Sequence, residues 1–227
     1  MDLIFSFVAT VLGLGLALIG LNKETTDKIS VFRNSDPNES FTSKEISKVE
    51  KVVLLVVVAV LCFASTMKIM DKVHDIIGIV KMIVCLLGLL GAACFDYREH
   101  RIPNIFPLVI ALSAVLLLGL GVLAEQAGAI AYVTTGILSS VVCGLILVVA
   151  SVITKQGIGA GDIKLICAIA LIAGVYTVMG TLFFGVVSCS VYGIIALILK
   201  KKSVSSAVPF GPFLLFGYVL TLFLINF

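Results

Sequence analysis

Charged side chains are scarce in this sequence. Asp, Glu, Lys and Arg together make up 13% of the chain, whereas an ordinary soluble domain carries about a quarter of such residues. Apolar residues account for 60% of the chain, and its mean hydropathy is +1.23. This shortage of charge excludes an ordinary soluble domain, and the composition predicts an integral membrane protein.

Long apolar runs divide the chain. A bilayer crossing needs roughly 20 apolar residues, so a chain of 227 residues has room for about eight crossings and little else. The runs lack the alternation of barrel strands, which favours helices. We therefore predict an all-α, polytopic membrane fold, with two spans meeting near Gly180 almost without a loop. The predicted spans are 3–21, 52–70, 76–95, 105–123, 129–153, 163–179, 180–199 and 207–226.

The first apolar run, residues 3–21, lies almost at the beginning of the sequence. Met1 and Asp2 provide no positively charged region before it, and no small-residue cleavage site clearly follows it. We therefore expect a permanent span rather than a secretory signal.

Residues 22–51 form a polar segment between the first two runs. Its basic and acidic side chains nearly cancel, which argues against a nucleic-acid-binding surface. About thirty residues are also too few for a domain with its own core. We interpret the segment as a solvated connector, in which Thr42 and Glu45 form a capping box before the second helix. The predicted organisation is an N-terminal helix pair in residues 1–73 and a six-helix unit in residues 74–227.

Lysine and arginine gather beside the segments that would share one side of the membrane. The positive-inside rule places that side in the cytoplasm. Two of these segments carry an aspartate: "DYREHRIPN", residues 96–104, and "KQGIGAGD", residues 155–162. We therefore expect both aspartates to face the cytoplasm. The basic residues concerned are Arg98, Arg101, Lys155, Lys200, Lys201 and Lys202.

Asp96 and Asp162 are the candidate catalytic residues. Asp96 ends the third run and Asp162 opens the sixth, so the chain crosses out and back between them. Each alone is explained by capping or by snorkelling to the interface. Two facing carboxylates, however, cannot both ionise easily, so one keeps a proton while the other acts as a base. Such a pair can activate water and protonate an amide leaving group, which is peptide hydrolysis without a metal or a covalent intermediate.

Glycines surround the second aspartate. Gly157, Gly159 and Gly161 remove side chains on one side of Asp162, which would let another backbone or an extended peptide approach it closely. We expect an extended substrate segment to pair with these glycines.

Three motifs carry a family resemblance. "GAGDIKL", residues 159–165, resembles the GxGD signature of membrane aspartic proteases, and in particular the form found in type IV prepilin peptidases. "DYREHRIPN" resembles the first-aspartate segment of that family. "VPFGPFLLFG", residues 208–217, resembles the segment that opens the family's last helix.

The resemblance covers roughly residues 74–227 and implies a six-helix catalytic core. It implies that Asp96 and Asp162 cleave the short basic leader of pilin-like precursors, just before the precursor's hydrophobic helix, at the cytoplasmic face of the cell (inner) membrane. It also points to substrate-binding or supporting residues in the three motifs. These are Gly159, Gly161, Lys164, Arg101, Pro103, Asn104, Pro209, Gly211 and Pro212.

Several of these residues have a plainer structural explanation. Pro103 would end the helix that carries Asp96, and Asn104 would cap the next one. Lys164 either anchors at the membrane interface or tunes the aspartate pair. The Pro-Phe-Gly-Pro segment, residues 209–212, either shapes a substrate groove at an irregular helix start or forms a simple kink.

The sequence lacks one feature of larger, bifunctional members of the family. Those members carry paired Cys-x-x-Cys motifs for zinc, joined to an N-methyltransferase activity, whereas here no Cys-x-x-Cys exists and residues 22–51 contain neither cysteine nor histidine. We therefore predict no structural zinc, no cofactor and no methylation of the trimmed substrate. His74 and His100 fall on opposite faces, so no shared metal site is expected. The cysteines, expected to pack as small apolar residues, are Cys62, Cys85, Cys94, Cys143, Cys167 and Cys189.

Two other functions remain open. A proton- or cation-coupled transporter would use the same intramembrane acids, although the two halves of the chain have no convincing internal repeat. An inactive membrane scaffold would keep the same fold. The expected partners are pilin-like precursors and membrane lipids. The net charge of +3 suits an anionic membrane surface. The oligomeric state is open.

Overall fold

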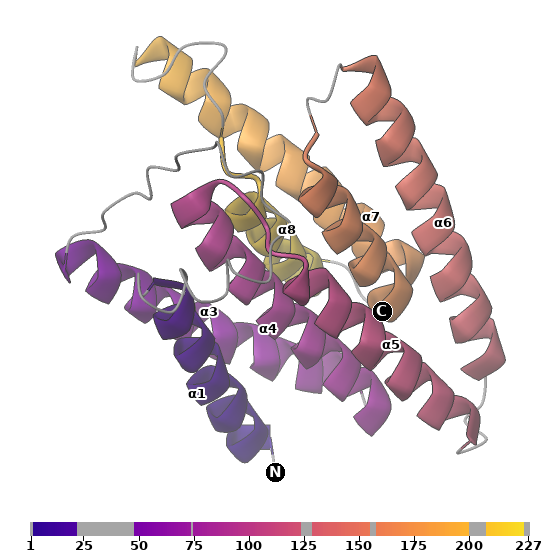
Figure 1. Cartoon of the computed structure of the whole chain (residues 1–227). Coiled ribbons are helices and arrows are strands. Elements are labelled where there is room, and N and C mark those ends of the chain that lie inside the picture. The colour runs from indigo at the N-terminus through magenta and orange to yellow at the C-terminus, as the bar shows by residue number, and fades with distance from the viewer. Residues whose placement is uncertain are drawn as a thin grey trace.

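The apolar runs of the sequence form helices. The computed structural model describes residues 2–21, 48–73, 75–123, 129–154, 158–199 and 208–224. These residues contain helices and no strands, which confirms the all-α prediction (Figure 1). The helices are α1 (Asp2–Leu21), α3 (Lys48–Lys72), α4 (Ile76–Glu99), α5 (Ile105–Leu123), α6 (Ala129–Ile153), α7 (Ala160–Ile198) and α8 (Gly211–Leu224).

Five of the helices, α3 to α7, are long and apolar enough to cross a membrane. The helices α1 and α8 contribute the shorter apolar stretches Val8–Leu18 and Gly211–Leu224. The described residues therefore agree with a polytopic membrane fold, but the predicted count of eight crossings is not confirmed. The predicted runs 105–123 and 129–153 coincide with α5 and α6.

A break within α7 corrects one predicted boundary. We expected two spans to meet near Gly180, but Gly180 is buried within regular helix, and the non-helical residue is Gly174, with φ 78° and ψ 177°. That backbone region is essentially restricted to glycine, because any Cβ would be strained there. Unbroken, 39 residues of helix would measure about 58 Å, roughly twice the hydrocarbon thickness of a bilayer.

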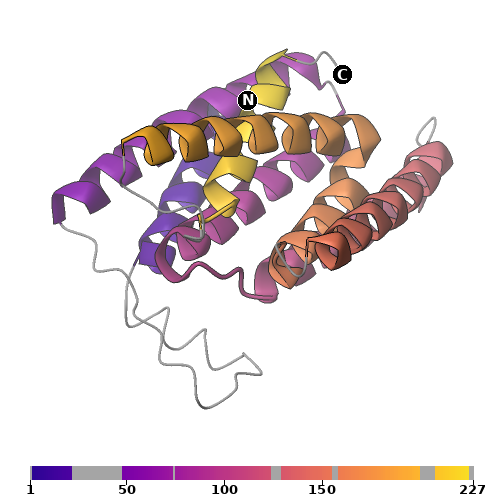
Figure 2. The same ribbon diagram turned by 90° about the horizontal axis from the view of Figure 1, so that it is seen from above.

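The break divides α7 into a first arm, residues 160–173, and a second arm, residues 175–198. The two arms point in different directions from the break (Figure 2). The first arm packs against α5 and α6, and the second arm packs against α8. The single helix α7 therefore connects the two sides of the molecule.

The helix α8 is packed closely between α4 and the second arm of α7. A Cβ at Gly217 would lie 2.6 Å from the backbone nitrogen of Gly185, so only glycine allows α8 to approach this arm so closely. On the other side, the buried Tyr218 donates a hydrogen bond to the Met82 carbonyl of α4, at 2.9 Å. These contacts bring the beginning of α8 to the end of α4.

The helices α1 and α3 pack against each other and against α4. Ser6 of α1 donates a hydrogen bond to the sulfur of Met67 in α3, at 3.2 Å. The division into residues 1–73 and 74–227 stays a prediction. The proposed capping box of Thr42 and Glu45, and most of the connector 22–51, lie outside the described residues.

Candidate active site

Asp96 lies in the last turn of α4. Its carbonyl accepts a hydrogen bond from the backbone N–H of His100, at 2.8 Å, and His100 ends the helix in the left-handed conformation, with φ 52° and ψ 32°. Histidine is among the residues enriched in that conformation. The sequence predicted that Pro103 ends this helix. In the structure α4 already ends at Glu99, because the left-handed cap residue His100 reverses the chain before Pro103 is reached.

The beginning of α8 holds the Asp96 carboxylate. The backbone N–H of Gly211 donates to Asp96 Oδ2 at 2.6 Å, and the Phe210 backbone lies close to this carboxylate. A helix N-terminus favours a negative charge, because its first N–H groups have no partner within the helix. The side chain of Asp96 is only 5% exposed, so this donor takes the place of water.

Gly211 is required by this contact. A Cβ added at Gly211 would lie 3.0 Å from Asp96 Cβ and 3.1 Å from the Cα of Ala93, closer than side chains normally approach. Pro209 lies in the extended residues before α8, and Pro212 lies in the first turn of α8, where its missing N–H breaks no helical hydrogen bond. The Pro-Phe-Gly-Pro segment thus forms the close-packed helix start that the sequence predicted; its role towards substrate stays a prediction.

Asp162 lies in the first turn of α7. Gly159 is the N-cap residue, and its backbone lies beside the Asp162 carboxylate. A Cβ at Gly159 would lie 3.0 Å from Asp162 Oδ2, so the glycine leaves room for the carboxylate to fold back onto the start of its own helix. The other oxygen, Oδ1, is buried and has no hydrogen-bond partner within the described part of the chain.

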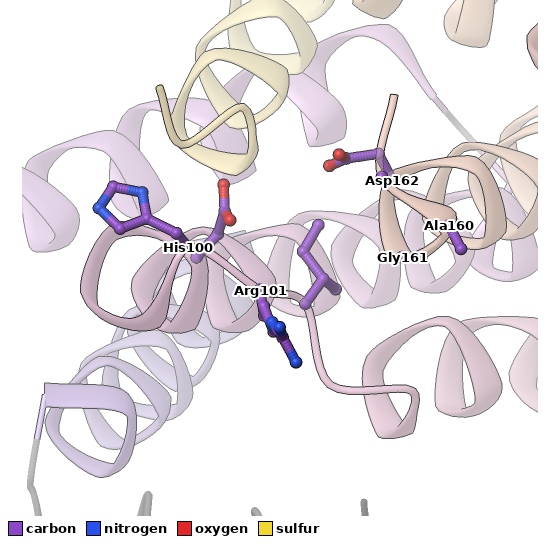
Figure 3. A pocket seen from close by; sticks show the side chains of 8 residues that line it. His100, Arg101, Ala160, Gly161 and Asp162 are labelled. Carbon is purple, nitrogen blue, oxygen red and sulfur yellow. The ribbon is translucent and has the colours of Figure 1, made fainter. Parts of the chain in front are cut away.

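The two aspartates line one cavity of about 330 Å³. The Asp162 carboxylate projects from the start of α7 into this space (Figure 3), and it is close enough to Asp96 for the two charges to interact. The sequence predicts that these two residues meet, and the structure brings them together. The lining residues are Asp96, His100, Arg101, Ile102, Gly159, Ala160, Gly161 and Asp162.

At Gly161, another part of the chain's own backbone makes the close approach that the sequence analysis allowed, and pairing of a substrate peptide with these glycines stays a prediction. A Cβ at Gly161 would lie 3.2 Å from both Cβ and the carbonyl oxygen of Ile102, so the chain itself occupies that side. The corresponding side of Gly159 is occupied by the Asp162 carboxylate. Gly157 lies outside the described residues.

His100 and Ile102 were not among the predicted site residues. His100 follows Asp96 by four residues, one helical turn, and this spacing was a signal that the two share a face. Ile102 gave no signal in the sequence, because its place depends on the path of the chain between α4 and α5. Arg101 was predicted and does line the cavity, but its guanidinium points away from Asp162 (Figure 3).

Lys164 and Asn104 lie beside the aspartate cavity without lining it. The Lys164 ammonium donates a hydrogen bond to Asn104 Oδ1 at 3.1 Å, joining the start of α7 to the start of α5. The side chain of Asn104, expected to cap α5, thus accepts a hydrogen bond from α7. Any influence of Lys164 on the aspartate pair stays a prediction.

Among the residues that the structure describes, no group of three or more His, Cys, Asp or Glu side chains is arranged to hold a metal ion. His74 is outside these residues. The expectation that the aspartate pair works without metal or cofactor stays a prediction.

Sequence comparisons concern the same part of the chain. The model of the type IV leader peptidase family matches residues 82–194, a stretch that contains both aspartates. The chain belongs to this family. Membership of the type IV leader peptidase family supports a peptidase role, and the long apolar helices make this member a multi-pass membrane protein.

A curated relative is the prepilin leader peptidase/N-methyltransferase of Bacillus subtilis (strain 168). It is 33% identical to this chain over 85 residues, which are 37% of the chain. The chain spans about a third of the length of this relative, 34%. No solved structure matches this type IV leader peptidase family member.

Proposed function

We propose that this chain is an aspartic endopeptidase that removes the leader peptides of pilin-like precursors. The observation that carries the proposal is the shared cavity of Asp96 and Asp162, two acids from different helices within the stretch that matches the family. Each carboxylate lies against a glycine at a helix start: Gly211 donates its backbone N–H to Asp96, and Gly159 adjoins Asp162. This arrangement supports an acid pair with fixed orientation rather than two independent helix caps.

In the proposed mechanism, the pair shares one proton. The ionised carboxylate removes a proton from a water molecule as the water oxygen attacks the scissile carbonyl carbon, while the protonated carboxyl stabilises the carbonyl oxygen. The tetrahedral intermediate then collapses, the C–N bond breaks, and the amide nitrogen takes a proton from the pair. Asp162 Oδ1, buried and without a partner in the described residues, is the oxygen available to water or substrate.

We place the reaction at the cytoplasmic face of the cell membrane. The basic residues Arg98 and Arg101 adjoin Asp96, and a cytoplasmic position for them agrees with the positive-inside rule. A precursor with an apolar helix in the bilayer would present the residues before that helix at the depth of the aspartates. Because the sequence has no Cys-x-x-Cys motif, we propose that the trimmed product is not methylated by this chain.

The test is cleavage of a panel of pilin-like precursors in detergent or liposomes. We expect Asp96→Asn and Asp162→Asn each to lower kcat by about four orders of magnitude, because the two acids act as a unit. The matched control is Asp71→Asn, which removes an exposed carboxylate in α3 that pairs with Lys68 at 3.5 Å. Exposed pairs contribute little to stability, so this variant should cleave normally.

Folding of each variant is checked by its melting temperature. The proposal fails if the wild type cleaves none of the precursors, or if the folded Asp96 and Asp162 variants cleave as fast as the wild type. Proton or cation flux through the purified protein in liposomes would then be measured, because a transporter is the other function that uses these acids.

A further inference from the structure

A second cavity lies beside that of the aspartates. It has a volume of about 470 Å³ and is bounded by α5, α6 and the first arm of α7. We call it the α5–α7 groove. Its lining residues are Asn104, Pro107, Leu108, Ala111, Ser140, Ile163, Lys164, Cys167, Ala168 and Leu171.

The groove adjoins the aspartate cavity along two segments of the chain. On the segment before α5, Ile102 lines the aspartate cavity and Asn104 lines the groove. At the start of α7, Asp162 lines the aspartate cavity, whereas the next residue, Ile163, lines the groove. The two cavities are therefore neighbours along both segments.

Lys164 and Asn104 line the end of the groove nearest the aspartate cavity, and a hydrogen bond of 3.1 Å joins them. From there the groove follows the first arm of α7 as far as Leu171. At 1.5 Å per residue, the distance from Ile163 to Leu171 is about 12 Å, or roughly two turns of a helix lying alongside. The groove therefore begins beside the aspartate cavity and runs along the apolar first arm of α7.

Small side chains line much of the groove. Ala111, Ser140, Cys167 and Ala168 leave space in which the backbone of another helix can approach closely, as in packed transmembrane helices. The hydroxyl of Ser140 donates to the Cys167 carbonyl at 3.0 Å, so this polar group is satisfied within the protein and does not require a polar ligand. An apolar helical segment fits these properties.

We propose that the α5–α7 groove receives the first two turns of the apolar segment that follows the cleaved bond of the precursor. The inference rests on the proposed function, since the occupant is the remainder of the same substrate. The position of the groove directly beside the aspartate cavity favours this occupant over a lipid chain, which could lie anywhere on the apolar surface. Docking in the groove sets the position of the scissile bond relative to Asp96 and Asp162.

Filling the groove tests the proposal. Ala111→Trp places a large side chain in it, whereas the matched control Leu112→Trp places the same side chain at a neighbouring position that is 61% exposed and does not line the groove. Two substrates are compared: the whole precursor, and a soluble peptide that spans the bond but lacks the apolar segment. We expect Ala111→Trp to lower kcat/KM for the precursor roughly tenfold more than for the peptide, mainly through KM. Leu112→Trp should leave the ratio of the two unchanged.

Two results would overturn the groove as a substrate site. One is an equal loss for both substrates with Ala111→Trp, which would indicate a structural or lipid effect, and the other is no loss for the precursor. If the wild type cleaves no precursor at all, the proposed function itself has failed. The two failures are therefore distinguishable.

Cross-linking gives a second measurement, independent of turnover. Cys167 lines the groove, so a protein that retains only this cysteine, in the Asp162→Asn background, is mixed with precursors carrying one cysteine at successive positions of the apolar segment. A copper–phenanthroline oxidant should join Cys167 to positions within the first two turns. A protein that retains only Cys189, in the second arm of α7, should not react. Failure of every position to join Cys167 would contradict the proposal.

Discussion

The two aspartates are held in different ways. Asp96 accepts a hydrogen bond from Gly211 at the start of α8, a residue 115 positions further along the chain, whereas Asp162 lies against Gly159, three residues away at the start of its own helix. The first contact exists only if α4, α8 and the second arm of α7 are packed together. The second is a property of a single helix start. Changes in distant packing should therefore affect Asp96 more than Asp162.

The largest effect in this comparison is expected from Gly211→Ala. The added methyl group meets Asp96 Cβ at 3.0 Å and the Ala93 backbone at 3.1 Å, and neither can move away without shifting α4 or α8. We expect cleavage to fall about 100-fold, because a displacement of about 1 Å can cost that much. The melting temperature should fall as well, because the contact is overpacked. Wild-type activity in the folded variant would contradict the role given to this glycine.

Gly174→Ala should act on both contacts, because Gly174 joins the arm that carries Asp162 to the arm that supports α8. With φ 78° and ψ 177°, alanine is strained there although no atom lies within 4 Å of the Cβ position. We expect a loss of about 1–3 kcal/mol in the free energy of unfolding. Reversible unfolding in denaturant would measure it, with Gly193→Ala, a helical glycine with equally open surroundings, as the control that should not destabilise the protein.

Gly159→Ala should have a smaller effect and leave folding intact. Its backbone, with φ −66° and ψ 138°, accepts alanine, and the atom that its Cβ would meet is the movable end of the Asp162 side chain. We expect kcat to fall about tenfold, a cost of roughly 1.4 kcal/mol in the barrier, with no decrease in melting temperature. Steady-state kinetics beside a melting curve tests this. A large loss of stability would mean that Gly159 supports more than the carboxylate.

The smallest effect is expected from Tyr218→Phe, which tests the tertiary support of Asp96 from a distance. The change removes the hydrogen bond from the Tyr218 hydroxyl to the Met82 carbonyl, at 2.9 Å, and leaves the ring in place. We expect a loss of about 1 kcal/mol in stability. The control is Thr154→Val, a surface change at the end of α6, which should lower cleavage less than Tyr218→Phe does. If Tyr218→Phe cleaves as fast as the wild type, the other contacts of α8 are sufficient to hold it in place.

The difference between local structure and contacts between distant parts of the chain also explains what could be predicted from the sequence. The helices α5 and α6 follow from apolar composition, which acts locally, and the first-turn position of Asp162 agrees with the residues around it. The break at Gly174 could not be predicted in the same way, because both Gly174 and Gly180 lie in apolar surroundings and only the packed structure distinguishes them. The contact of Gly211 with Asp96 was equally hidden, because it depends on how α8 crosses α4.

The break in α7 also sets a constraint on the length of its first arm. Residues 160–173 form a helical lever between Gly174 and Asp162, and each added or deleted residue would rotate the carboxylate by about 100° around the helix axis. A single insertion there would therefore turn Asp162 away from Asp96 even if the arm remained fully helical. The number of residues between Asp162 and Gly174 therefore fixes the direction in which the carboxylate points. Within this arm, substitutions should be tolerated more readily than insertions or deletions.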